Sequence, residues 1–156
     1  MEAESCCDSE FLNTERLLVT NQIAWFSCSF PPRNATVRIF YYLPPHWDKV
    51  LFVLHGIYRD ATKYLKHWLP TAAQRGIAIL APEFSEASFP GDEYASGGVF
   101  APGPSGTIRD RTEWSFAVIE LAFDAFLARI GSAQPPASYF LYGHSAGAQF
   151  VHRSLS

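Results

Sequence analysis

The sequence predicts an α/β fold whose sheet is mostly parallel and begins with an antiparallel hairpin. Short apolar runs, which suit strands buried on both faces, alternate with stretches of helical periodicity. The first two predicted strands are separated only by the turn sequence of residues 31–34. The 156 residues, of which 48% are hydrophobic and 17% charged, suit one globular domain.

The first half of the chain contains the hairpin and a strand–helix–strand unit. Residues 1–20 are polar and we expect them to be loosely ordered, so the predicted domain covers residues 21–156. Residues 22–30 and 36–43 are rich in aromatic and β-branched side chains and predict the hairpin strands. Residues 50–54 predict a buried strand. Residues 61–75 predict a helix, which Pro70 ends or kinks and which stops at Gly76. Residues 77–81 predict a further buried strand, which ends at Pro82.

The second half begins with an irregular segment. Residues 83–111 are rich in glycine and proline, and so long an insert in a compact domain is usually functional or mobile. Thr112 is the expected N-cap of a helix that ends at Gly131. Residues 139–142 predict a third buried strand, which leads into a final helix through Ser156. The aromatic side chains of this half either wall a pocket or pack in the core; they are Phe89, Tyr94, Phe100 and Trp114.

Charge and composition exclude several classes of function. The net charge is −3 and there is no basic block, which argues against nucleic acid as a partner. No apolar run approaches the length of a membrane span, and the first residues lack the features of a secretory signal, so we expect a cytoplasmic protein without a membrane partner. The three cysteines are Cys6, Cys7 and Cys28, which predict neither a disulfide framework nor a zinc site.

The run Gly143-His144-Ser145-Ala146-Gly147 carries the strongest chemical signal. Gly-x-Ser-x-Gly between a strand and a helix is typical of a nucleophile elbow, a strained turn that projects the serine oxygen above the sheet. Side chains at Gly143 and Gly147 would collide with the neighbouring strand and helix. Ala146 would offer its backbone N–H to an oxyanion. The alternative is a tight strand–helix turn without chemistry.

A second turn suits the same chemistry. His55 and Gly56 follow the first parallel strand directly, and Gly56 lets the backbone turn toward a substrate. The loop after that strand supplies the second oxyanion donor in acyl-transfer enzymes of this type, and we expect the N–H of Ile57, or else that of Tyr58. The alternative is an ordinary turn at the end of a strand.

Together, residues 54–56, 81–84 and 142–150 resemble the α/β-hydrolase superfamily, particularly its esterase and polyhydroxyalkanoate-depolymerase-like members. The resemblance extends over about residues 35–156. It implies a three-layer fold and hydrolysis of a small-molecule carboxylic ester by a serine–acid–histidine triad. It also implies that Ser145 attacks, that Ala146 and the region of Ile57 hold the oxyanion, and that neither a metal nor an organic cofactor takes part.

In this superfamily the acid and the histidine follow the serine, and here only eleven residues follow Ser145. None is acidic, and His152 lies two helical turns on, roughly 10 Å along the axis and too far for a base. We therefore expect an N-terminal portion of a hydrolase that lacks the later strands, the acid and the base. One alternative is an inactive remnant that binds a ligand or a partner through its open sheet edge. Another is self-association of two copies through that edge.

Overall fold

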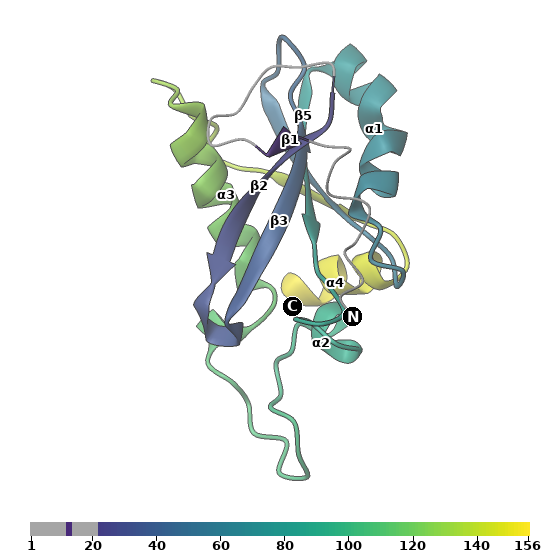
Figure 1. The fold of residues 1–156 in the computed structure, drawn as a ribbon, viewed down its shortest axis with the longest axis vertical. Helices are drawn as coiled ribbons and strands as arrows, with labels where there is room; N and C mark the ends of the chain where they lie inside the picture. The colour runs from purple at the N-terminus through teal and green to yellow at the C-terminus, as the bar shows by residue number, and fades with distance from the viewer. Residues whose placement is uncertain (1–11, 14–21) are drawn as a thin grey trace, which may run out of the picture.

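The computed structural model describes residues 12–13 and 22–156, and these form a mixed sheet with helices on both faces (Figure 1). The β2–β3 and β3–β5 pairs are antiparallel and the other pairs are parallel. The α/β class and its antiparallel N-terminal hairpin are thus confirmed. Within the described residues the strand order is β1-β2-β3-β5-β4-β6, with β1 Leu12–Asn13, β2 Ala24–Phe30, β3 Ala35–Tyr42, β4 Lys49–Leu54, β5 Ile77–Glu83 and β6 Phe140–Gly143.

The expected loose segment, residues 1–20, falls almost entirely outside the described residues. Its two described members, Leu12 and Asn13, pair in parallel with Ala24 and Trp25 of β2. A short 3-10 helix, Pro31–Arg33, closes the hairpin between β2 and β3, as the turn sequence predicts.

The sheet separates two hydrophobic cores, so the fold has three layers. Helix α1 (Ala61–Arg75) covers one face, while α3 (Ala117–Ile130) and α4 (Ala146–Ser154) cover the other (Figure 1). On the α1 side, Leu65 packs with Phe40 and Val53 of the sheet. On the other side, Phe126 and Phe150 pack with sheet residues such as Phe52. Alternate residues along β3 and β4 therefore supply both cores, as strands buried on both faces require.

Two prolines lie within their elements instead of ending them, so the predicted end at Pro70 is wrong, while the alternative of a kink there stays a prediction. Helix α1 runs through Pro70 to Arg75 and ends at Gly76, whose φ is 65°. Leu65 and Ala72, on either side of Pro70, are fully buried, so packing on the sheet outweighs the hydrogen bond that the proline removes. Strand β5 continues through Pro82 to Glu83. Because β4 pairs with β5 only as far as Leu80, Pro82 has no partner on that side that needs its missing N–H.

The irregular segment contains more local structure than its composition predicts. It includes the short helix α2 (Asp92–Ala95), an isolated bridge between Phe100 and Ile108, and the 3-10 helix η2 (Arg111–Glu113). Thr112 is not the predicted N-cap, because Asp110 accepts its N–H and forms a capping box with Glu113. Helix α3 begins at Ala117 without a side-chain cap and ends at Gly131 as predicted.

The predicted burial of the last strand is wrong. Within the described residues, β6 pairs only with β4 and lies at the edge of the sheet. Phe140 is 61% exposed and Tyr142 is 38% exposed. An apolar sequence does not specify whether a second neighbouring strand covers it, and here no described strand does.

Candidate active site

Ser145 occupies a strained turn between β6 and α4. Its φ is 55° and its ψ −118°, a conformation that is costly for a residue with a Cβ. A Cβ on Gly143 would overlap the backbone of Gly147, and a Cβ on Gly147 would overlap the carbonyl oxygens of Leu54 and His55. The two glycines therefore let the turn pack closely against the end of β4, and Ser145 stays exposed at that edge.

The turn after β4 lies directly against Ser145. A Cβ built on Gly56 would lie 3.8 Å from the Cβ of Ser145. Ile57, Ser145 and Ala146 line one hollow of about 310 Å³. Ala146 is the first residue of α4, whose N–H has no partner within the helix. In the described part of the chain, the N–H groups of Ile57 and Tyr58 donate no hydrogen bond either. Unpaired donors therefore lie next to an exposed hydroxyl.

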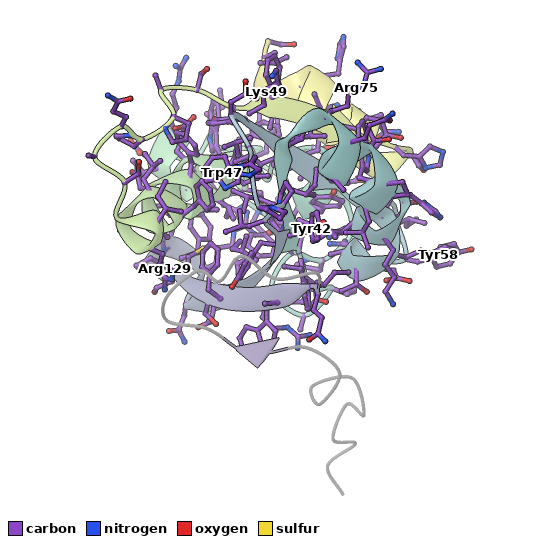
Figure 2. All side chains as sticks on the ribbon, turned by 90° about the horizontal axis from the view of Figure 1, so that it is seen from above. Tyr42, Trp47, Lys49, Tyr58, Arg75 and Arg129 are labelled. Atoms are coloured by element: carbon purple, nitrogen blue, oxygen red, sulfur yellow. The ribbon has the colours of Figure 1, made fainter. Side chains whose placement is uncertain are left out.

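The structure separates the two expected donors of this turn. Ile57 contributes to the hollow at Ser145, whereas Tyr58 is not among its lining residues. The side chain of Tyr58 is 93% exposed and projects away from the body of the protein (Figure 2). The geometry favours Ile57 over Tyr58 as a neighbour of the serine.

His55 is fully buried and braces the turn rather than facing the serine. Its Nδ1 donates to the carbonyl oxygen of Gly56 (2.9 Å), and its Nε2 accepts the N–H of Phe84 (3.0 Å). Because a carbonyl only accepts and an amide N–H only donates, these partners fix one neutral tautomer. Burial, with the nearby Arg59 charge, lowers the pKa of His55 from 6.5 to about 4. His55 has no ring nitrogen left to act as a base.

Arg59 and Tyr94 clamp the same turn from outside. The Arg59 guanidinium donates to the carbonyl oxygens of Phe84 (2.7 Å) and Phe89 (2.9 Å) and pairs with Glu86 (2.7 Å). It lies 4.8 Å from the ring centre of Tyr94, whose hydroxyl donates to the carbonyl oxygen of His55 (2.7 Å). These contacts tie the turn to residues 84–94. Nothing in the sequence signals the role of Arg59 or its φ of 61°.

The remaining histidines and nearby carboxylates do not complete a triad within the described residues. No hydrogen bond joins Ser145 to a histidine there, and the other four histidines are exposed. His144 contacts the hydroxyl of Tyr64 through Nδ1 (3.3 Å), and His152 lies on α4 beyond the serine. Asp60 caps α1 and Glu83 pairs with Arg38. Asp92 alone among these acids lines the hollow at Ser145.

The aromatic residues of the irregular segment divide between core and surface hollows. Phe89 and Tyr94 are buried, and Tyr94 also borders the hollow at Ser145. Phe100 and Trp114 line a separate cavity. Cys28 is a free, buried thiol, and Cys6 and Cys7 lie outside the described residues.

The described residues contain neither a cluster of metal-ligating side chains nor a membrane-spanning helix. No group of three or more potential metal ligands occurs there. None of the helices described is long and apolar enough to cross a membrane.

Known proteins resemble this chain in structure. No family model and no curated protein matches the sequence. A poly(aspartic acid) hydrolase from Sphingomonas sp. KT-1 is 41% identical, with a TM-score of 0.68 over 76% of this chain and 45% of its own. A poly(3-hydroxybutyrate) depolymerase from Bordetella parapertussis is 27% identical, with a TM-score of 0.73 over 86% and 46%. A fluorophosphonate-binding serine hydrolase from Staphylococcus aureus is 18% identical, with a TM-score of 0.56 over 81% and 48%. The chain spans just under half the length of each.

Proposed function

The chain has the esterase-like α/β-hydrolase fold, and we propose that it is part of a serine hydrolase that cleaves carboxylic esters through an acyl-enzyme on Ser145. The observation that carries the proposal is the strained backbone of Ser145 beside unpaired N–H donors. The φ of 55° holds an exposed hydroxyl at the start of α4, and Ile57 and Ala146 border the same hollow.

The proposed reaction has two halves. The Oγ of Ser145 attacks the ester carbonyl carbon as its proton passes to a base, and the N–H groups of Ala146 and Ile57 donate to the oxyanion that forms. Collapse of this tetrahedral intermediate breaks the bond to the alcohol, which leaves with a proton and gives the acyl-enzyme. Water then attacks the acyl carbon, and the acid product leaves as Ser145 regains its proton.

The proposal assigns the base and its acidic partner to residues supplied from outside these 156. His55 is unsuited because both its ring nitrogens are engaged, and no other described histidine bonds to Ser145. Loss of the base alone costs roughly a millionfold in turnover in subtilisin, a serine hydrolase of another fold. We therefore expect these residues alone to hydrolyse esters very slowly unless a base is added.

Chain-like acyl compounds are the proposed substrates. The two most similar structures described above are named for their action on poly(aspartic acid) and poly(3-hydroxybutyrate). The hollow at Ser145 is bordered by polar residues, including Gln149 and Asp92, which suits the polar backbone of such a chain better than a long alkyl group.

The test combines labelling with chemical rescue. With imidazole added as the base, a fluorophosphonate probe should label the wild-type chain and not the Ser145→Ala variant, while Ser105→Ala, at an exposed serine in the loop, should label as the wild type does. In the presence of imidazole, the wild type should hydrolyse a p-nitrophenyl ester faster than the Ser145→Ala variant does, because imidazole supplies the absent base. Labelling that persists in Ser145→Ala would show that another residue reacts. Equal rates in wild type and variant under all conditions would contradict the proposal.

One observation favours a second function, that of a non-catalytic remnant that binds a partner. Phe140 and Tyr142 are exposed on β6, which has a single neighbour among the described strands. Such an edge offers unpaired backbone groups to another strand. An absence of labelling and of rescued turnover, together with concentration-dependent association, would favour this alternative.

A further inference from the structure

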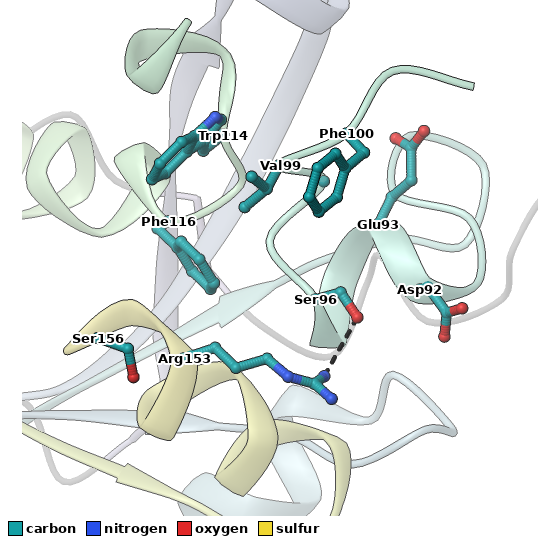
Figure 3. A pocket seen from close by; sticks show the side chains of 10 residues that line it. Asp92, Glu93, Ser96, Val99, Phe100, Trp114, Phe116, Arg153 and Ser156 are labelled. Atoms are coloured by element: carbon teal, nitrogen blue, oxygen red, sulfur yellow. Dashed lines mark hydrogen bonds between the residues drawn. The ribbon is translucent and has the colours of Figure 1, made fainter. Parts of the chain in front are cut away.

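A second cavity opens on the same side of the sheet as Ser145 but does not include it. Its volume is about 640 Å³, within the range of small-molecule sites. Aromatic rings form much of its wall, and the Arg153 side chain extends from α4 beneath Ser96 (Figure 3). Its lining includes Ser96, Val99, Phe100, Trp114, Phe116 and Arg153.

The cavity continues the hollow at Ser145 along helix α4. Asp92 borders both spaces. Gln149 lines the hollow at Ser145, and Arg153, one turn further on, lines the cavity and donates to the Gln149 side chain (3.2 Å). Arg153 lies eight positions after Ser145 along α4, a rise of roughly 12 Å between their Cα atoms. A linear molecule of a few repeating units would reach from one space to the other.

Arg153 gives the cavity a specific chemistry. Its Nη1 donates to the carbonyl oxygen of Ala95 (3.0 Å) and to the Ser96 hydroxyl (3.1 Å), which fixes the guanidinium. Its Nη2 and Nε make no hydrogen bond in the described part of the chain, and the residue is exposed. A positioned guanidinium with free donors suits a carboxylate or an ester carbonyl oxygen.

The acidic neighbours do not cancel this preference. Glu93 also borders the cavity, but its carboxylate pairs with both Arg33 and Arg109. Asp92 is exposed on α2, and its carboxylate points away from the cavity in Figure 3. The rings of Phe100, Trp114 and Phe116 would contact the methyl and methylene groups of a chain.

We propose that this cavity is a second subsite, which binds an acyl unit several atoms away from the bond that Ser145 attacks and holds its carbonyl or terminal carboxylate on Arg153. The substrate class rests on the proposed function, but binding at this subsite does not require catalysis. A chain that spans the hollow at Ser145 and this cavity makes contacts in both, so it binds more tightly than a single acyl unit, which occupies only one of them. The subsite thereby selects chain-like substrates.

The test measures binding in Ser145→Ala, which removes turnover. The probes, titrated by calorimetry, are the linear trimer of 3-hydroxybutyric acid and the methyl ester of the monomer, which has no carboxylate for Arg153. We expect the trimer to bind at least tenfold more tightly than the monomer. Arg153→Gln should weaken trimer binding about tenfold, the usual cost of losing a hydrogen bond to a charged group, and leave monomer binding unchanged. Arg75→Gln, at the exposed end of α1, is the charge-matched control and should change neither.

A second variant guards against a folding effect of Arg153→Gln. Val99→Trp fills the cavity without touching the guanidinium contacts and should also weaken the trimer alone. Circular dichroism and thermal unfolding show whether each variant folds. Trimer binding that is no tighter than monomer binding, or that survives both substitutions in folded protein, would overturn the subsite. Fluorophosphonate labelling is scored separately on chains with Ser145 intact. Arg153-dependent binding without labelling would retain the subsite and reject the proposed function.

Discussion

Acidification tests whether neutral His55 holds the turn that faces Ser145. The Nε2 of His55 accepts the Phe84 N–H inside a fully buried site. Protonation of Nε2 would place its new N–H against the N–H of Phe84 and would add a positive charge beside Arg59. The folded state therefore disfavours protonation of His55. The unfolded chain has no such restriction and binds the proton at an ordinary pKa.

The size of the effect follows from the shift in pKa. The pKa of His55 falls from 6.5 to about 4 on folding. Above pH 6.5 both states are neutral at this residue and its contribution is fully present. Between pH 6.5 and 4 only the unfolded state is protonated, so stability is lost as the pH falls. Each pKa unit corresponds to about 1.4 kcal/mol, which gives a loss of about 2 kcal/mol at pH 5 and about 3 kcal/mol below pH 4.

Urea unfolding at pH 7.5 and pH 5 measures this loss. The variant His55→Gln keeps an acceptor for the Phe84 N–H but cannot be protonated, so its free energy of unfolding should fall about 2 kcal/mol less than that of the wild type. His152→Gln removes an exposed histidine of α4 and serves as the matched control, which should follow the wild type. An identical pH dependence in the wild type and His55→Gln would refute the reasoning.

Three further predictions concern packing, reactivity and association. Gly147→Ala should destabilise the fold by about 3 kcal/mol in urea unfolding, because its methyl group meets backbone oxygens. The methyl group of Gly56→Ala would instead lie 2.7 Å from the Tyr64 hydroxyl, so adding Tyr64→Phe should restore about 1 kcal/mol of the free energy of unfolding. Additive effects of the two substitutions would contradict this contact. Burial raises the pKa of Cys28 to about 11, so iodoacetamide at pH 8 should modify its peptide only after unfolding, as mass spectrometry would show. Phe140→Lys should weaken self-association in sedimentation velocity, and a wild type that is monomeric at every concentration would contradict an adhesive β6 edge.

The sequence predicted best where local chemistry decides the structure. Apolar runs located β4 and β5, and glycines at positions 76 and 131 marked the ends of α1 and α3. The turn at Ser145 was predictable because its glycine spacing has a steric cause that acts within a few residues. The prediction failed where distant packing decides. Pro70 stays within α1 because the sheet holds both sides of it, and β6 is half-exposed because only one described strand lies beside it.

Arg59 shows why the support of the candidate site was beyond sequence reasoning. An arginine in a loop is ordinarily a solvated charge, and its neighbours in sequence give no reason for a left-handed φ. The partners that hold this conformation are carbonyl groups 25 and 30 residues away. His55 has a similarly distant partner in Phe84. The donors beside Ser145 therefore depend on the irregular segment, and a change at residues 84–94 should move the turn even though no residue of that segment carries the proposed chemistry.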